Sequence, residues 1–88
     1  MIMNFYDKIQ EMDYDIKSQN DNCIVIEKKK NISDILIIFD NKEKVISGYL
    51  KPNNILKEID DISYQYANFR EMKADLKELA SLSKYDII

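Results

Sequence analysis

Ile35-Leu36-Ile37-Ile38-Phe39 is the longest unbroken apolar run of the chain, and it determines which fold the remaining sequence can form. The run is rich in β-branched residues and lies between polar turn signals, which is typical of a buried strand and not of a helix. We therefore predict a central strand over residues 32–40, with the other elements arranged around it.

Three further segments alternate between apolar and polar residues, as strands do when they bury one side. The predicted strands cover residues 13–17, 23–28 and 45–50. Tyr14 and Ile16 are expected to face the core from the first of these strands. In the second strand, Ile24 and Ile26 are expected on one face and Val25 on the other. In the third, Gly48 marks a bulge or a close approach by another element.

Helical spacing is found on both sides of the strands. Asn4 is placed to cap a first helix that ends near residue 12. One face of this helix is formed by Phe5, Ile9 and Met12. After the last strand the apolar spacing lengthens to about 3.6 residues, and Asn53 or Asn54 is expected to cap a C-terminal helical region. Its apolar stripe comprises Ile55, Ile59, Ile62, Tyr66, Phe69, Met72, Leu76 and Leu79.

Asn68 bears on how many helices this region forms. Asn68-Phe69-Arg70-Glu71 resembles a capping box, which favours a break there and two helices that fold back on each other. The alternative is one helix over residues 54–82, roughly 40 Å long, whose apolar seam would be buried against a second copy. The first arrangement predicts a monomer, which we favour over the homodimer that the second predicts.

The order of these elements predicts a single α+β domain over residues 1–88. An N-terminal helix is followed by a three- or four-stranded antiparallel sheet and then by one long or two shorter C-terminal helices packed on one sheet face. The chain has one cysteine, no apolar stretch of membrane-spanning length and no signal-peptide pattern. A cytoplasmic location is therefore expected.

Charge is distributed unevenly along the chain, which carries a net charge of −3. Residues 1–23 hold five carboxylates and two lysines, so this segment alone contributes −3. The basic cluster Lys28-Lys29-Lys30 is interpreted as a solvated hairpin turn. Nucleic-acid binding rests on clustered cations that neutralise several phosphates, so no direct contact with nucleic acid is expected.

No combination of residues in the sequence supports catalysis. The chain lacks histidine, and its single glycine cannot form a phosphate-binding loop. Asp13 and Asp15 are expected to project from the same side of a strand, but acid–base catalysis also needs a pocket that shifts their pKa values. Cys23 has no histidine to activate it and is expected to pack as a small apolar residue. We expect a protein that is not an enzyme and uses neither cofactor nor metal.

The tyrosines are candidates for binding, because tyrosine is enriched at the centres of protein interfaces. Tyr6 and Tyr64 lie beside the predicted apolar faces and are expected at the surface. Tyr14, Tyr49 and Tyr66 are expected in the core.

A further pattern links the start of the chain to its central strands. It consists of Met3-Asn4, Asp7, Ile9, Glu11, Asp13-Tyr14 and Ile16-Lys17, followed by Leu36-Ile37-Ile38 and Val45-Ile46-Ser47. These residues resemble the corresponding parts of a small phage-encoded anti-CRISPR family. Its members inhibit Cas9 by occupying the surface that reads the DNA motif beside the target. The expected order of elements is also similar to that family's helix, three-stranded sheet and two helices.

The resemblance implies an acidic surface that imitates DNA. In that family the acidic stretch lies in the C-terminal helices, whereas residues 64–79 of this chain balance three acids with three basic residues. An acidic surface would therefore have to come from the N-terminal part and the connection after the central strand. The candidate partner-binding residues are Asp7, Glu11, Asp13, Asp15, Asp40, Glu43 and Tyr64.

The sequence thus predicts a non-enzymatic phage or mobile-element inhibitor in the cytoplasm of a bacterial host. Its expected partner is a host defence protein, a CRISPR effector by resemblance, whose nucleic-acid binding it blocks. The alternative is a structural or regulatory dimerisation module, as in antitoxin-like or phage accessory proteins.

Overall fold

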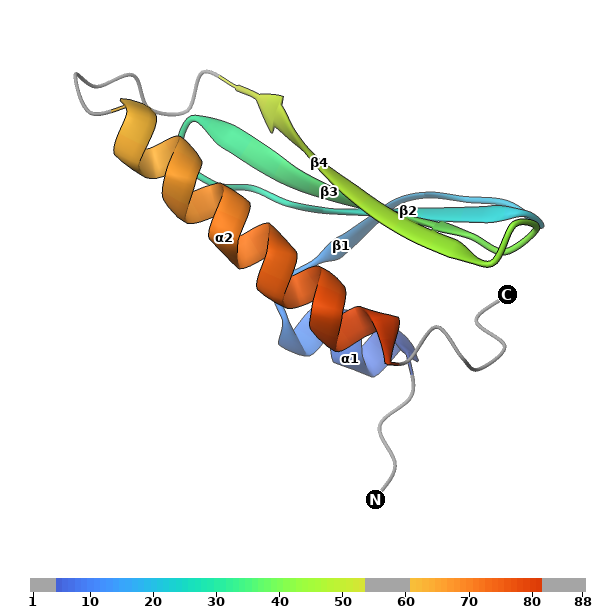
Figure 1. Ribbon diagram of the computed structural model, residues 1–88. Coiled ribbons are helices and arrows are strands. Elements are labelled where there is room, and N and C mark those ends of the chain that lie inside the picture. Colours follow the sequence, from blue (N-terminus) through green and yellow to red (C-terminus); the bar gives the residue numbers. More distant parts are fainter. Residues whose placement is uncertain (1–4, 54–60, 82–88) are drawn as a thin grey trace.

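The computed structural model describes residues 5–53 and 61–81 and confirms the predicted α+β fold (Figure 1). The elements are α1 (Phe5–Glu11), β1 (Asp15–Gln19), β2 (Cys23–Lys28), β3 (Ser33–Asp40), β4 (Val45–Pro52) and α2 (Asp61–Ala80). The four strands form one antiparallel sheet in the order β1-β2-β3-β4. β3 contains the apolar run and lies between β2 and β4, so its predicted central position is confirmed.

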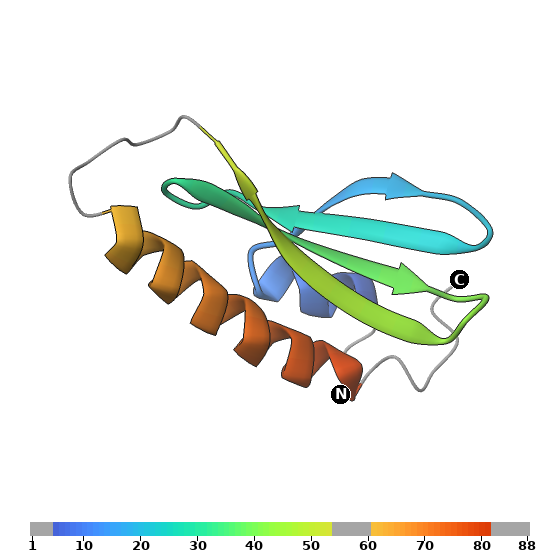
Figure 2. The ribbon, with the colours of Figure 1, turned by 45° about the horizontal axis from the view of Figure 1, so that its top comes forward.

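Both helices lie on the same side of the sheet, and α2 runs alongside β4 (Figures 1 and 2). Between the helices and the sheet lies a core of Ile9, Tyr14, Ile24, Ile26, Ile35, Ile37, Phe39, Met72 and Leu79. The Phe5 ring of α1 packs edge-on against Phe39, with ring centroids 4.9 Å apart. Fully burying a large aliphatic side chain contributes roughly 1.5–3 kcal/mol, so this layer supplies much of the stability.

Gly48 allows α2 to pack closely against β4. A Cβ atom at this position would lie 3.1 Å from Leu76 Cδ1 and 3.2 Å from Met72 Sδ, tighter than ordinary van der Waals contact. The close approach predicted for Gly48 is therefore confirmed. A side chain here would force Leu76 and Met72 to shift, so the absence of one favours the close contact of helix and edge strand.

The first strand differs from its prediction. β1 begins at Asp15, because α1 ends in a Schellman motif in which Tyr14 N donates to Ile9 O and Asp13 N to Gln10 O. This motif needs a left-handed residue, and Asp13 takes that role with φ 67°. The expectation that Asp13 and Asp15 share one side of a strand is therefore wrong. Tyr14 is buried as predicted, but Ile16 is 41% exposed.

The predicted helix break at Asn68 is also wrong. α2 continues through this residue, whose side chain is only 3% exposed and donates from Nδ2 to Asn31 O at 2.8 Å. Asn68 therefore ties the middle of a helix to the β2–β3 loop and does not cap a helix. The predicted caps Asn4 and Asn54 and the stripe residues Ile55 and Ile59 lie outside the described residues.

Three consecutive carbonyl groups of the β2–β3 loop accept hydrogen bonds from distant asparagines. Asn53 Nδ2 donates to Lys30 O at 2.9 Å and Asn68 Nδ2 to Asn31 O at 2.8 Å. The backbone of Asn53 donates to Ile32 O at 2.7 Å. Ile32 itself has φ 75°, a conformation that is strained for a β-branched residue. Contacts from Asn53, which follows β4, and from Asn68 of α2 hold the loop in this conformation.

Candidate functional site

The N-terminal acids form a continuous exposed stretch along α1 and into β1. Asp7 and Glu11 are one helical turn apart on α1, Asp13 follows the helix and Asp15 begins β1. All four side chains are exposed. The structure therefore brings four of the seven candidate partner-binding residues into one region, which we call the α1–β1 surface.

The two lysines of this segment pair with carboxylates of other elements, and Lys8 Nζ also lies 3.9 Å from Glu11 Oε1 within α1. Lys8 Nζ lies 2.6 Å from Glu78 Oε1 of α2, and its hydrogen bond to Glu78 raises the pKa of Lys8. Lys17 Nζ lies 3.4 Å from Glu27 Oε2 of β2. Because the lysines are engaged in these pairs, carboxylates dominate the charge of the α1–β1 surface.

A hollow of about 250 Å³ lies between α1 and β1. It is lined by Tyr6, Ile9, Gln10, Tyr14, Asp15 and Ile16. Tyr6 is 39% exposed and its hydroxyl oxygen accepts a hydrogen bond from Gln19 Nε2 at 2.9 Å, while Ile16 is also half exposed. The α1–β1 surface thus carries a depression bordered by one carboxylate, a tyrosine and an apolar side chain, with further exposed carboxylates on the same segment, which suits it to contact a protein.

The other candidates lie elsewhere. Asp40 ends β3, and its Oδ1 accepts hydrogen bonds from Lys42 N and Glu43 N at 3.0 Å each, so this side chain shapes the β3–β4 turn. Glu43 is exposed in the same turn. Tyr64 is half-buried near the start of α2, where its neighbour Gln65 accepts a hydrogen bond from the hydroxyl of Ser33. Ser33 begins β3, so Tyr64 and Asp40 lie near opposite ends of a strand that spans roughly 23 Å.

The interpretation of the basic cluster as a solvated hairpin turn is wrong for Lys28, which ends β2, whereas Lys29 is exposed in the β2–β3 loop as expected. Lys28 Nζ contacts Glu71 Oε2 at 2.8 Å and Asp75 Oδ2 at 2.9 Å, and it stands 4.5 Å from the centre of the Tyr14 ring. Lys30 Nζ adds an ion pair of 3.0 Å with Glu71. Tyr14 donates its hydroxyl to Asp75 at 2.8 Å. This cluster joins α2 to β2 across the core boundary.

The pKa values in this cluster follow from burial and pairing. Burial alone would lower the pKa of Lys28, but hydrogen bonds to Glu71 and Asp75 raise it above its ordinary value. Burial alone would raise the pKa of Glu71, but hydrogen bonds from Lys28 and Lys30 lower it. Burial, together with the bond to Asp75, raises the pKa of Tyr14 far above its usual range. These groups therefore stay charged, or in the case of Tyr14 neutral, at physiological pH.

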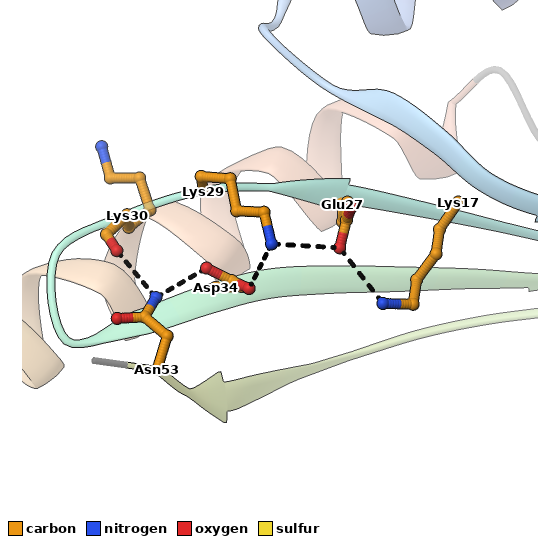
Figure 3. A network of polar contacts seen from close by, with 6 residues as sticks. All are labelled: Lys17, Glu27, Lys29, Lys30, Asp34 and Asn53. Carbon is orange, nitrogen blue, oxygen red and sulfur yellow. Dashed lines mark hydrogen bonds and ion pairs between the residues drawn. The ribbon is translucent and has the colours of Figure 1, made fainter. Parts of the chain in front are cut away.

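A second polar network lies on the sheet face that points away from the helices (Figure 3). Asp34, buried on β3, accepts hydrogen bonds from Asn53 Nδ2 at 2.6 Å and from Lys29 Nζ at 3.1 Å. Lys29 Nζ also lies 4.0 Å from Glu27, and the bond to Asp34 raises the pKa of Lys29. The network pins the end of β4 to the β2–β3 loop, and we assign it a structural role.

The sequence interpretation missed an exposed strip on α2. We define the outer flank of α2 as Ile62, Tyr66, Phe69, Arg70, Lys73 and Lys77, which share one side of the helix at about 100° per residue. Ile62 is 82% exposed, Tyr66 64% and Phe69 45%. The predicted core position of Tyr66 is therefore wrong, and so is that of Tyr49, which is 46% exposed.

Cations accompany the aromatic rings on this flank. Arg70 Cζ lies 5.4 Å from the centre of the Tyr66 ring, and Lys73 Nζ lies 5.3 Å from that of Phe69. A signal was present in the sequence, because each ring is followed by a cation four residues later. An aromatic residue that alternates with cations at this spacing indicates a solvent-facing flank more than a core stripe.

Within residues 5–53 and 61–81, no three side chains of the types that ligate metals are placed to hold an ion. Cys23 is half-buried and not in a disulfide. In the same part of the chain, no helix combines the length and apolar character that crossing a membrane requires. Comparison of the chain with protein families, curated proteins and solved structures finds no match.

Proposed function

We propose that this protein is a non-enzymatic inhibitor that binds a host defence protein and blocks its nucleic-acid site. The observation that supports this proposal is the α1–β1 surface, which carries four exposed carboxylates and a hollow lined by Asp15, Tyr6 and Ile16 among others. The resemblance of the N-terminal half to anti-CRISPR proteins adds the class of target, a Cas9-type effector in the bacterial cytoplasm.

The physical reason is charge complementarity. A nucleic-acid site is lined with lysine and arginine, so a cluster of carboxylates can occupy it in place of phosphates. Opposite charges speed association and set the orientation of the two proteins, while salt screens them. Tyr6 and Ile16 would supply contact area that charge alone does not.

The test compares two variants with the same change in net charge. Asp15→Lys alters the α1–β1 surface, whereas Asp21→Lys alters the β1–β2 turn at the other end of the sheet. Binding to a Cas9–guide RNA complex is measured at low and at physiological salt. We expect the first variant to lose affinity and salt dependence and the second to retain both. Equal effects of the two variants, or none, would refute the proposal.

Asp13 is unsuited to charge reversal in this test. Its positive φ favours Asp, Asn or Gly, so lysine there would add backbone strain of roughly 1–2 kcal/mol. Asp13→Asn removes the charge and keeps the left-handed conformation accessible. It serves as a third variant, which we expect to weaken binding to a smaller extent.

The alternative function, a dimerisation module, is favoured by the continuous helix α2 and its exposed apolar side chains. Light scattering separates the two functions, because a stable dimer would have twice the 10.4 kDa mass of the chain.

A further inference from the structure

We propose that β4 and the outer flank of α2 together take up an extended, acidic segment of a partner protein, which adds to the sheet as a fifth strand. This surface is separate from the α1–β1 surface, and the inference does not depend on the function proposed above. It follows from the state of the sheet edge, the position of α2 and the charge of its flank.

The two edges of the sheet differ. β1 is short, has an irregular register between Ile16 and Ser18 and carries Lys17, all of which discourage a further strand. β4 has eight residues and pairs with β3 without a shift in register from Val45 to Pro52. Its own edge-blocking residues, Lys51 and Pro52, are confined to its last two positions, so Val45 to Leu50 remain for pairing. Among the described residues, no strand lies on its other side. Its outer backbone groups are therefore available to pair with an added strand.

α2 offers that strand a surface to pack on. The helix lies beneath β4, held close at Gly48, and both views show it running beside the edge of the sheet (Figures 1 and 2). The helix-facing side chains Ile46 and Leu50 of β4 are only half-buried. A fifth strand would cover them and would place alternate side chains against Ile62, Tyr66 and Phe69. One added segment would thus cover both the exposed apolar side chains of α2 and the outer backbone edge of β4.

The charges of α2 identify the kind of segment. Glu71, Asp75 and Glu78 turn to the other side of the helix, where lysines of β2, its loop and α1 pair with them. Arg70, Lys73 and Lys77 are left on the outer flank, and all three are exposed. Within Ile62 to Ser81, no acidic residue shares this flank. A segment with carboxylates among its apolar residues would complement it.

A second copy of the chain fits less well. If two β4 strands paired edge to edge about a two-fold axis, the outer flanks of two α2 helices would approach each other. Each flank carries the same three cations, so like charges would be brought together at the interface. An acidic segment removes this repulsion and uses the same backbone edge.

The test uses an end-capped peptide in which every second residue is threonine and the residues between are alternately valine and glutamate, so that valine and glutamate side chains face α2 together. Binding is followed by chemical-shift changes and by hydrogen exchange of the β4 amides, with full-length protein. We expect the peptide to bind with a dissociation constant of millimolar or below and to slow hydrogen exchange of the β4 amides. A matched peptide with lysine in place of glutamate should bind at least about fivefold more weakly.

Variants locate the site. Tyr66→Ala should weaken the glutamate peptide about tenfold and Lys73→Glu about fivefold, while Lys42→Glu, an equal charge change in the β3–β4 turn, should have no effect. Circular dichroism verifies that each variant is folded. Absence of binding, equal binding of the lysine peptide, or protection of β1 in place of β4 would overturn the inference. Protection of β4 that grows with protein concentration and without peptide would overturn it in favour of a second copy.

Discussion

Asn68 provides the sharpest test of how α2 is joined to the sheet. In the structure its amide donates to Asn31 O, whereas a helix cap at this position would use the side-chain oxygen as an acceptor. Asn68→Asp distinguishes these roles, because aspartate keeps the acceptor and loses the donor. As a cap, aspartate would be as good as asparagine. If position 68 instead needs a buried donor, aspartate would place a carboxylate beside the carbonyl oxygen of Asn31 and destabilise the protein.

Two contributions determine how much Asn68→Asp lowers the free energy of unfolding. Loss of the hydrogen bond costs about 1–1.5 kcal/mol, and burial of a charge or polar group without a partner adds about 1–3 kcal/mol. We therefore expect Asn68→Asp to lower the free energy of unfolding by about 2–4 kcal/mol. Asn68→Ala loses the bond without burying a charge and improves helix propensity, so its expected cost is only about 1 kcal/mol.

Urea denaturation followed by circular dichroism measures both changes. A shift of the midpoint at constant slope would show that stability alone has changed. Ser63→Ala, at an exposed position of the same helix, is the control and should change stability by less than about 0.5 kcal/mol. If Asn68→Asp were as stable as the unchanged protein, the assigned donor role would be refuted.

The remaining predictions concern the charge cluster and the close approach of α2. Lys28→Met should cost about 3 kcal/mol in urea denaturation, because two carboxylates would lose their shared cation; a cost below about 1 kcal/mol would contradict the role of Lys28. Stability measured against pH should decline as pH falls below the ordinary Glu71 value of 4.5 towards its lowered pKa, and should decline again above 10.5, where Lys28 with its raised pKa loses its proton. Both declines should be shallower in Lys28→Met. Gly48→Val should cost about 1–3 kcal/mol by thermal unfolding, since its methyl groups would displace Leu76 and Met72; an unchanged melting temperature would show that α2 can move away at no cost.

The sequence was sufficient where structure follows from local pattern. Alternation located β2 at its observed bounds, and the apolar run located the central strand. The failures have non-local causes. Asn68 resembles a helix cap in the sequence because its true partner, the Asn31 carbonyl, lies in a distant loop. The sequence predicts a solvated Lys28 because its two carboxylate partners lie on α2, far along the chain.

The candidate site divides in the same way. The acids of α1 and β1 are close together because they are close in sequence, and this proximity could be predicted. The exposure of Tyr66 and Phe69 depends on how α2 is rotated about its axis, which is fixed by the contacts of Met72 and Leu79 with the sheet. The apolar stripe of α2 is wider than the part of the helix that the sheet can bury. The sequence does not show which side of the stripe stays in solvent.

The bonds to the β2–β3 loop have a consequence for the order of folding. A hairpin normally forms early because its contacts are local. Here the turn contains Ile32 in an unfavourable backbone conformation, and its carbonyl groups rely on residues that lie 21 to 37 positions further along the chain. We expect this hairpin to close late, after β4 and α2 have docked. A peptide spanning only β2 and β3 should not form the native turn, and loss of α2 should loosen the end of the sheet to which it is bound.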